Sequence, residues 1–305
     1  MLKKYIKVYV LVVTSMFLIT GCGSQEEASV DISSELANQV GDFMASVDES
    51  YGSTGSAFNV EQSMIDSQLN SELLFLEKIS PTPLSLQISR KLIPFANAAS
   101  CFGQGFNCAA GVNTRTFNSC TVGSATFTGS VAISWITSAA CMEVAGANTV
   151  RRSPNFSVSK SNATVSVYKT GTNGQEMTWT NPSSPKTVTV SSDGIRRTAT
   201  VGGSTVYDVS TSTVGAMTVS GTTRVGRRIT AGTLRFTNHL NGEVCDLTPS
   251  NVVWGSGCTC ATAGSWSGSC TINGAFNVTV SSCGQGSVTY NGQSRSVTFD
   301  RCAGS

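Results

Sequence analysis

The feature that most constrains the fold is a two-residue alternation of apolar and polar side chains through the last two thirds of the chain. It is clearest over residues 163–168, 187–190, 275–280 and 296–299. Alternation at period two is typical of strands with one buried and one solvated face. Turn dipeptides separate these segments, and Asn and Gly tolerate the positive φ that tight hairpins require. They are Asn173-Gly174, Asp193-Gly194, Asn241-Gly242, Asn273-Gly274 and Asn291-Gly292.

No helical stretch interrupts these strands, which excludes parallel βαβ units. For residues 101–305 we therefore predict a mainly β, disulfide-rich domain. It is an antiparallel meander of about ten to fourteen strands, closed as a sandwich or a barrel-like body.

Residues 31–80 follow a helical period instead. Ile32, Leu36, Val40, Phe43 and Val47 recur on one face of an amphipathic helix, and Asp31 is its expected cap. A second stripe follows and ends before a proline, at Ile65, Leu69, Leu73 and Leu76. We predict an acidic two-helix hairpin, with residues 81–100 as a linker to the β domain. Helices that lie on membranes carry Lys and Arg on their polar face, so the acidic residues here favour packing against protein.

The first residues form a leader. Lys3, Lys4 and Lys7 precede an apolar run over Val8–Ile19, which is shorter than the roughly 20 residues of a membrane-spanning helix. The run ends in Leu18-Ile19-Thr20-Gly21-Cys22, which resembles the lipobox of bacterial lipoproteins. The resemblance covers the first 22 residues only.

This resemblance implies that residues 1–21 are a signal peptide and that Cys22 carries a thioether-linked diacylglycerol and an amino-terminal acyl chain, such as palmitate. Residues 22–30 would then be a lipid tether. Gly23 and Ser24 follow the cysteine in place of Asp, which favours the outer membrane in a cell with two membranes. The alternative is an ordinary signal peptide cut elsewhere, which leaves Cys22 free to form a disulfide.

Cysteine usage agrees with export. Beyond Cys22 the chain has ten cysteines, an even number that predicts a disulfide framework in an exported protein. They are Cys101, Cys108, Cys120, Cys141, Cys245, Cys258, Cys260, Cys270, Cys283 and Cys302. We expect the local pairs Cys101–Cys108 and Cys120–Cys141, and pairing of the last six cysteines among themselves. Cys258 and Cys260 face opposite sides of an extended strand, so they should reach different partners. A zinc site built from such cysteines and His239 is disfavoured in an oxidising compartment.

Charge is divided unevenly along the chain. Residues 23–98 hold three basic and eleven acidic residues, whereas residues 99–305 hold fourteen basic and seven acidic ones. The two parts should face each other, or the basic part should meet an anionic surface. Three arginine pairs are candidates for an anion-binding rim: Arg151-Arg152, Arg196-Arg197 and Arg227-Arg228. Strand alternation offers a simpler interpretation, in which one arginine of each pair points outward and aids solubility.

Signs of catalysis are weak. His239 is the only histidine, on an expected strand over 233–240, and no G-x-S-x-G or nucleotide-binding motif is present. Seven acidic residues scattered through the β domain do not identify the carboxyl pair of a glycosidase. The tryptophans Trp135, Trp179, Trp254 and Trp266 could line a sugar site, but isolated tryptophans in a β domain favour the core. We therefore assign no catalytic residue, metal or cofactor, and we do not expect an enzyme.

The sequence thus predicts a cell-envelope protein held in the membrane by the lipid on Cys22, on the periplasmic face or the cell surface. Its expected role is structural or binding, toward envelope or extracellular polyanions or proteins. The alternatives are a periplasmic factor for envelope assembly or maintenance and, third, a hydrolase on a β scaffold. Nucleic acid is a poor partner for an exported, anchored protein.

Overall fold

The computed structural model describes residues 31–51, 72–73, 75–76, 78–79, 108–181, 187–221 and 224–302. The predicted leader, the tether, the linker, Cys101 and much of the second helix lie outside these residues. The described elements are one long helix, fourteen strands and two short 3₁₀ turns. They are α2 (Ile32–Tyr51), β1 (Val112–Val122), β2 (Ala125–Trp135), β3 (Gly146–Lys160), β4 (Ala163–Lys169), β5 (Gln175–Asn181), β6 (Thr187–Ser192), β7 (Ile195–Val201), β8 (Ser204–Ser220), η3 (Arg224–Gly226), β9 (Arg228–Asn238), β10 (Val244–Trp254), β11 (Ala261–Cys270), β12 (Gly274–Ser282), β13 (Gln285–Tyr290), β14 (Gln293–Thr298) and η4 (Asp300–Cys302).

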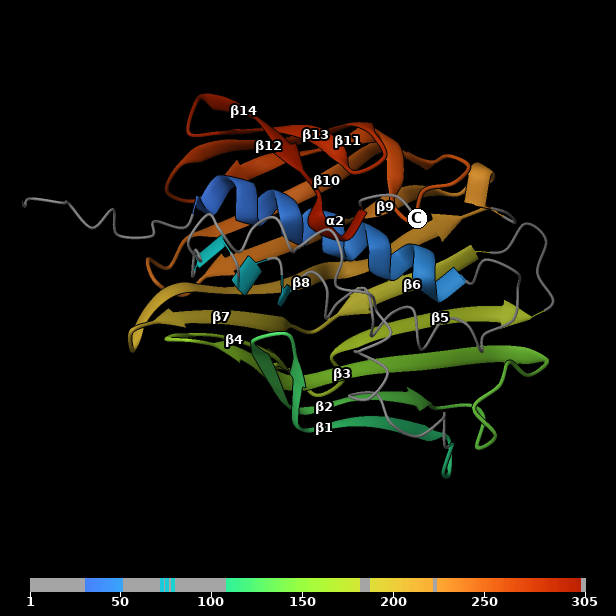
Figure 1. Cartoon of the computed structure of the whole chain (residues 1–305). Helices are drawn as coiled ribbons and strands as arrows, with labels where there is room; N and C mark the ends of the chain where they lie inside the picture. Colours follow the sequence, from blue (N-terminus) through green and yellow to red (C-terminus); the bar gives the residue numbers. More distant parts are fainter. Residues whose placement is uncertain are drawn as a thin grey trace, which may run out of the picture.

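The strands form one antiparallel 14-stranded sheet, which confirms the predicted β meander. The sheet curves around α2, and β1 and β14 lie at its two edges (Figure 1). Four of the five predicted turn dipeptides lie in connections between strands, and the fifth, Asn273-Gly274, ends at the first residue of β12; all five glycines have positive φ, for example 76° at Gly242. Three of these dipeptides close hairpins, whereas Asn173-Gly174 and Asp193-Gly194 connect β4 to β5 and β6 to β7, strands that pair with other neighbours.

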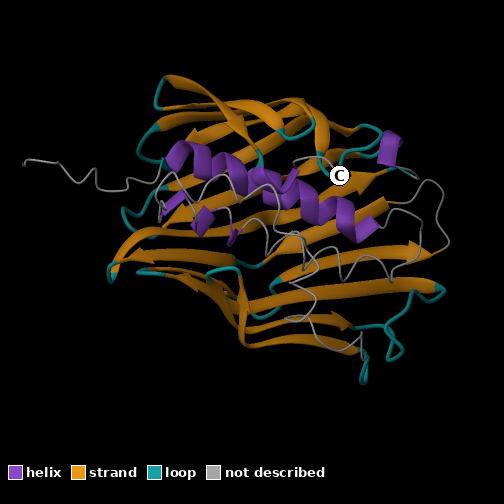
Figure 2. Ribbon diagram, viewed as in Figure 1, coloured by secondary structure: helices purple, strands orange, loops and turns teal. Residues whose placement is uncertain are grey.

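Helix α2 lies along the concave face of the sheet (Figure 2). Asp31 caps it as predicted, because its Oδ1 accepts a hydrogen bond from Ser33 N at 3.2 Å. The predicted apolar stripe is buried apart from Ile32, which is half-buried, and polar residues beyond the stripe are buried as well, including Glu35 and Asn38. The helix is therefore part of the core of the β domain. Within the described residues, we find no helix with the length and apolarity needed to cross a bilayer.

Four disulfides join described cysteines: Cys108–Cys141, Cys245–Cys270, Cys258–Cys283 and Cys260–Cys302. Cys120 is disulfide-bonded as well. The last six cysteines pair among themselves, and Cys258 and Cys260 reach different partners, as predicted. The expected pairs Cys101–Cys108 and Cys120–Cys141 are wrong. Cys108 and Cys141 flank the same end of the β1–β2 hairpin, whereas Cys120 lies eight residues along β1 from Val112, roughly 27 Å away.

The sheet divides between β3 and β8. The first half of β3, Gly146–Arg152, pairs with β5, and its second half, Asn155–Lys160, pairs with β4. Strand β8 likewise pairs with β7 through Thr211 and with β6 from Met217 onward. Pro154 lies where β3 changes partner, a place suited to a residue that has no N–H to donate. The β4–β7 pair and the β5–β6 pair thus lie end to end between β3 and β8. We call the place where the two pairs meet the fork.

Candidate functional site

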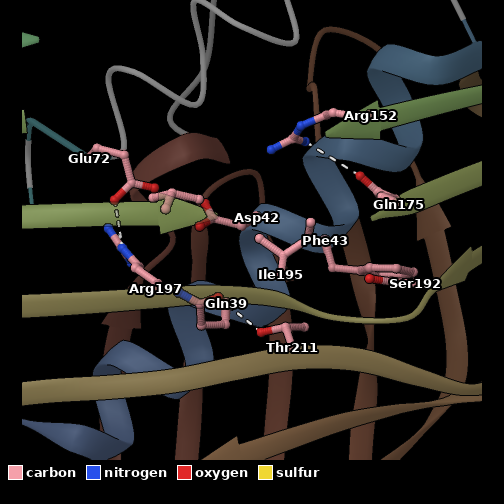
Figure 3. A pocket seen from close by; sticks show the side chains of 11 residues that line it. Gln39, Asp42, Phe43, Glu72, Arg152, Gln175, Ser192, Ile195, Arg197 and Thr211 are labelled. Carbon is pink, nitrogen blue, oxygen red and sulfur yellow. Dashed lines mark hydrogen bonds and ion pairs between the residues drawn. The ribbon is translucent and has the colours of Figure 1, made fainter. Parts of the chain in front are cut away.

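A pocket lies at this fork, with α2 as its floor (Figure 3). Strands β3 to β8 supply its walls. Glu72 closes one side and belongs to the second helical segment, by which we mean the described helical residues 72–73, 75–76 and 78–79. We call it the fork pocket. Its lining residues are Gln39, Asp42, Phe43, Glu72, Arg152, Val167, Gln175, Ser192, Ile195, Arg197 and Thr211.

The charged centre of the fork pocket is Arg197, on the inward face of β7. Its Nε donates a hydrogen bond to Glu72 Oε2 at 2.6 Å, and its Nη1 donates to Glu35 Oε1. All three side chains are buried, and the guanidinium carbon lies 4.0 Å from the centre of the Phe75 ring. One guanidinium thus joins helix α2 and the second helical segment to the sheet. This contact confirms that the acidic and basic parts of the chain face each other.

Burial raises the pKa of Glu35 to about 7, and the positive charge of Arg197 opposes that rise only in part. Arg197 is shared between two carboxylates, so it cannot fully compensate either of them. The same two carboxylates raise the pKa of Arg197, against the effect of its burial. Arg197 therefore stays charged, while Glu35 titrates near neutral pH.

Two donors in the fork pocket lack an acceptor. Gln39 Oε1 accepts a hydrogen bond from Thr211 Oγ1 at 3.1 Å, but Gln39 Nε2 donates to no group in the described part of the chain. Arg197 Nη2 likewise donates to no group in the described part of the chain. Both atoms are buried, and both residues line the fork pocket. Unpaired buried donors are costly, so the fork pocket favours a group that accepts hydrogen bonds.

The size of the fork pocket limits what it can hold. Its volume is about 50 Å³, enough for one functional group or a water rather than a whole drug-sized ligand. A larger cavity of about 410 Å³ lies between α2, the second helical segment and β14. In it, Asn38 and Lys78 both donate to Asp300 and Ser34 donates to Asp31, and none of its lining residues, all of them described, has a buried side-chain donor or acceptor without a partner. Hydrogen-bonding capacity therefore favours the fork pocket.

The predicted arginine pairs divide between the two faces of the sheet. Arg152, Arg197 and Arg227 are buried, whereas their neighbours point outward, as strand alternation requires. Of the outward residues, Arg151 pairs with Glu176 and Arg196 pairs with Asp208, and Arg228 is exposed. The six arginines therefore do not share one face, and anion binding by them stays a prediction.

His239 lies just after β9, on the outer face of the sheet. Its Nε2 is 2.9 Å from Ser210 Oγ, in an exposed hydrogen bond. The nearby carboxylate of Asp208 is engaged by both Arg196 Nε and Nη2 at 2.7 Å, and only its backbone oxygen accepts from His239 N. None of these residues lines the fork pocket or the larger cavity. This arrangement does not present a nucleophile to a bound substrate.

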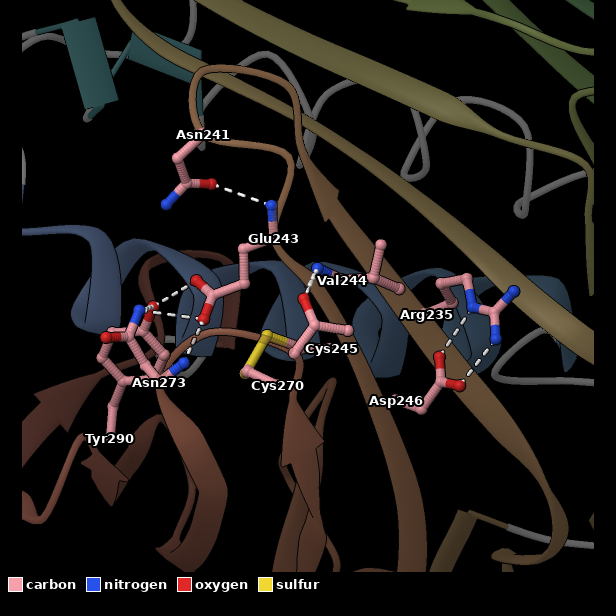
Figure 4. Close-up of a disulfide and its surroundings, with 10 residues drawn as sticks. Arg235, Asn241, Glu243, Val244, Cys245, Asp246, Cys270, Asn273 and Tyr290 are labelled. Atoms are coloured by element: carbon pink, nitrogen blue, oxygen red, sulfur yellow. Dashed lines mark hydrogen bonds and ion pairs between the residues drawn. A yellow bond between two sulfur atoms is a disulfide. The ribbon is translucent and has the colours of Figure 1, made fainter.

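A third polar cluster surrounds the Cys245–Cys270 disulfide (Figure 4). Glu243 is buried and accepts hydrogen bonds from Asn273 N and Nδ2 at 2.9 Å and from Tyr290 Oη. Burial, with the hydrogen bond to Glu243, raises the pKa of Tyr290. Glu243 also lies close to both sulfurs, but these are bonded to each other and offer no thiolate to a metal. The cluster joins the β9–β10, β11–β12 and β13–β14 turns.

The tryptophans confirm the core interpretation, because Trp135, Trp179, Trp254 and Trp266 are all buried. Sequence reasoning missed the fork pocket itself. Gln39 lies at the edge of the predicted apolar stripe, three residues after Leu36 and four before Phe43, so helical spacing could have placed it near the buried face. Pro154 within a strand was the one available signal of the fork.

No protein-family model, curated protein or solved structure matches this chain.

Proposed function

We propose that the protein is a lipid-anchored binding protein of the cell envelope, and that the fork pocket receives a hydroxyl group of an envelope glycan. The anchor is the lipid expected on Cys22. The bonded cysteines support an oxidising, extracytoplasmic compartment. The single observation that carries the binding role is the pair of unpaired donors, Gln39 Nε2 and Arg197 Nη2, in the fork pocket.

The charge of the fork pocket selects among acceptors. Two arginines, Arg152 and Arg197, stand beside the carboxyl groups of Asp42 and Glu72, with Glu35 on the far side of Arg197. The fork pocket therefore has no excess of positive charge, which disfavours a phosphate or a polyanion. A neutral hydroxyl accepts a hydrogen bond without adding charge. We thus narrow the partner from anionic glycans to the neutral hydroxyl groups of a glycan.

The test measures glycan binding to the purified, lipid-modified mature protein in detergent, by saturation-transfer NMR and by calorimetry. Neutral oligosaccharides and a polyanion such as heparin are the probes. We expect a neutral oligosaccharide to bind, and Gln39→Leu to weaken it at least tenfold with little change in melting temperature. Gln293→Leu, an exposed glutamine on β14, is the matched control and should bind normally.

Binding that is equal in both variants would place the ligand outside the fork pocket. Binding of heparin alone, lost at high salt, would instead favour the outward arginines. Protease treatment of intact cells, with Cys22→Ser as a control, distinguishes a surface role from the periplasmic alternative. Cleavage of the β domain only after the outer membrane is opened would support a periplasmic role.

A further inference from the structure

One end of the sheet is formed by six short turns. The register of the meander places the β1–β2, β3–β4, β7–β8, β9–β10, β11–β12 and β13–β14 turns at the same end, on the left in Figure 1. Their residues are 123–124, 161–162, 202–203, 239–243, 271–273 and 291–292. All of them are described, and we call this end the turn rim.

Two aliphatic side chains project from the turn rim. Leu240 is 49% exposed and Ile272 is 59% exposed. Their turns are neighbours, because Thr271 N donates to Val244 O at 2.9 Å and Val244 N donates to Thr271 Oγ1 at 3.0 Å. The buried Glu243 cluster holds both turns from beneath (Figure 4). Leu240 and Ile272 are thus exposed on a braced surface rather than on free loops.

The turn rim also exposes no charged side chain. Glu243 is the only Asp, Glu, Lys or Arg in the six turns, and it is 1% exposed. Lys160, next to the β3–β4 turn, is also buried. Arg295, three residues into β14, is paired with Asp31 at 2.8 Å. The turn rim can therefore approach an apolar medium without removing an unpaired charge from water.

Helix α2 begins beside this end. Asp31 contacts Arg295 near the β13–β14 turn, and the helix then runs toward the opposite end, where Gly41 O lies 3.7 Å from Cys260 Sγ and Cys302 Sγ. Cys22 precedes Asp31 by nine residues, which span at most about 32 Å. An acyl chain on Cys22 therefore holds the membrane within reach of the turn rim. The opposite end lies a strand length further away, about 36 Å for an eleven-residue strand.

The opposite end has exposed apolar residues as well, namely Val112, Ile136, Met142 and Val225. It differs in charge, because Glu143 is only half-buried and Arg228 is exposed there. Distance from the anchor and charge both favour the turn rim.

From these observations we propose that the turn rim rests on the lipid surface that holds Cys22, with Leu240 and Ile272 inserted among the lipids. The partner is the zwitterionic headgroup layer, since none of the six turns carries a Lys or Arg for anionic lipid and the exposed Arg295 beside them is paired with Asp31. This inference rests on the proposed lipid anchor. It orients the body so that the opposite end, with Arg228, faces away from the membrane.

The test uses the lipid-modified full-length protein in vesicles of phosphatidylcholine that carries bromine on its acyl chains. Leu240→Trp and Ile272→Trp are compared with Val225→Trp at the opposite end, against the constant signal of the four buried tryptophans. We expect the new tryptophans at 240 and 272 to be quenched at least twofold more than the one at 225. Equal quenching at all three positions would overturn the inference but not the proposed anchor. An absence of quenching at 240 and 272, in protein that floats with the vesicles, would have the same meaning.

Flotation and the mass of the amino-terminal peptide report the anchor separately. Protein without lipid overturns the proposed anchor, and the inference falls with it. Hydrogen exchange provides a second measurement that requires no substitution in the turn rim. Residues 239–243 and 271–273 should exchange at least twofold more slowly in vesicles than in the Cys22→Ser protein, and unchanged exchange there contradicts the inference.

Discussion

Arg196 and Arg197 show how much one step along a strand changes the energetics of a residue. Arg196 points outward and pairs with Asp208 at 2.7 Å, in part exposed to solvent. Arg197 points inward and is shared by Glu35 and Glu72, with all three side chains buried. The alternation that predicts a strand also predicts which of the two is buried. The carboxylates that meet it are 125 and 162 residues away along the chain, and no local pattern identifies them.

We therefore expect very different costs from the same substitution at these neighbouring positions. Arg197→Gln leaves two buried carboxylates without their cation and should lower the free energy of unfolding by about 3–5 kcal/mol. Arg196→Gln breaks a partly solvated pair and should cost about 1 kcal/mol or less. Urea denaturation of both variants checks this. Similar costs at the two positions would contradict the buried network.

At the scale of elements, sequence patterns predicted the strands, the turns and the helix cap, because each depends on residues close together in the chain. They failed at Cys108 and Cys120, where proximity in sequence was mistaken for proximity in space. A strand carries Cys120 to the far end of the hairpin. They also showed one buried face on α2, because periodicity detects apolar residues and is blind to the polar residues Glu35, Asn38 and Gln39, which are buried as well.

Gly174 lies at the fork, immediately before β5. Its φ is +69°, and a Cβ there would lie 2.4 Å from the carbonyl oxygen of Arg152. Gly203, in the β7–β8 turn, has a φ of +86° with open space around it. We expect Gly203→Ala to cost about 1–2 kcal/mol for its backbone conformation alone. Gly174→Ala should cost clearly more, because the clash is with backbone. Chemical denaturation measures both variants, and equal costs would mean that the fork adapts freely.

At the scale of the whole molecule, the buried contact of Arg197 links overall stability to pH. Burial raises the pKa of Glu35 from 4.5 in the unfolded chain to about 7 in the folded protein. Between these two values the folded state binds more protons than the unfolded state, so the contribution of Glu35 to stability is present at low pH. It is lost as the pH rises toward 7. The sheet and α2 share one core, so this loss is felt by the whole fold.

The loss is expected to reach at most about 3 kcal/mol across this range of pH. Glu35→Gln should remove it, so the difference in unfolding free energy between the two proteins should change from pH 4.5 to pH 7. Denaturant titrations at several pH values provide the measurement, and the remaining groups cancel in the comparison. A difference that is independent of pH would mean that Arg197 keeps Glu35 ionised throughout.

The connection between β4 and β7 indicates which part of the chain could be shortened without disturbing the rest of the sheet. Lys169 and Ile195 are paired neighbours, and Thr170 N donates to Gly194 O at 2.9 Å, so the chain leaves β4 and returns to β7 at nearly one point. The β5–β6 hairpin is thus an insertion within what is otherwise a tight β4–β7 hairpin. A shorter chain that turned directly from β4 into β7 would keep the order of the remaining meander and lose part of the fork pocket. The insertion supplies Gln175 and Ser192 to the lining of the fork pocket, whereas the two unpaired donors, on Gln39 and Arg197, belong to α2 and β7 and would remain in such a chain.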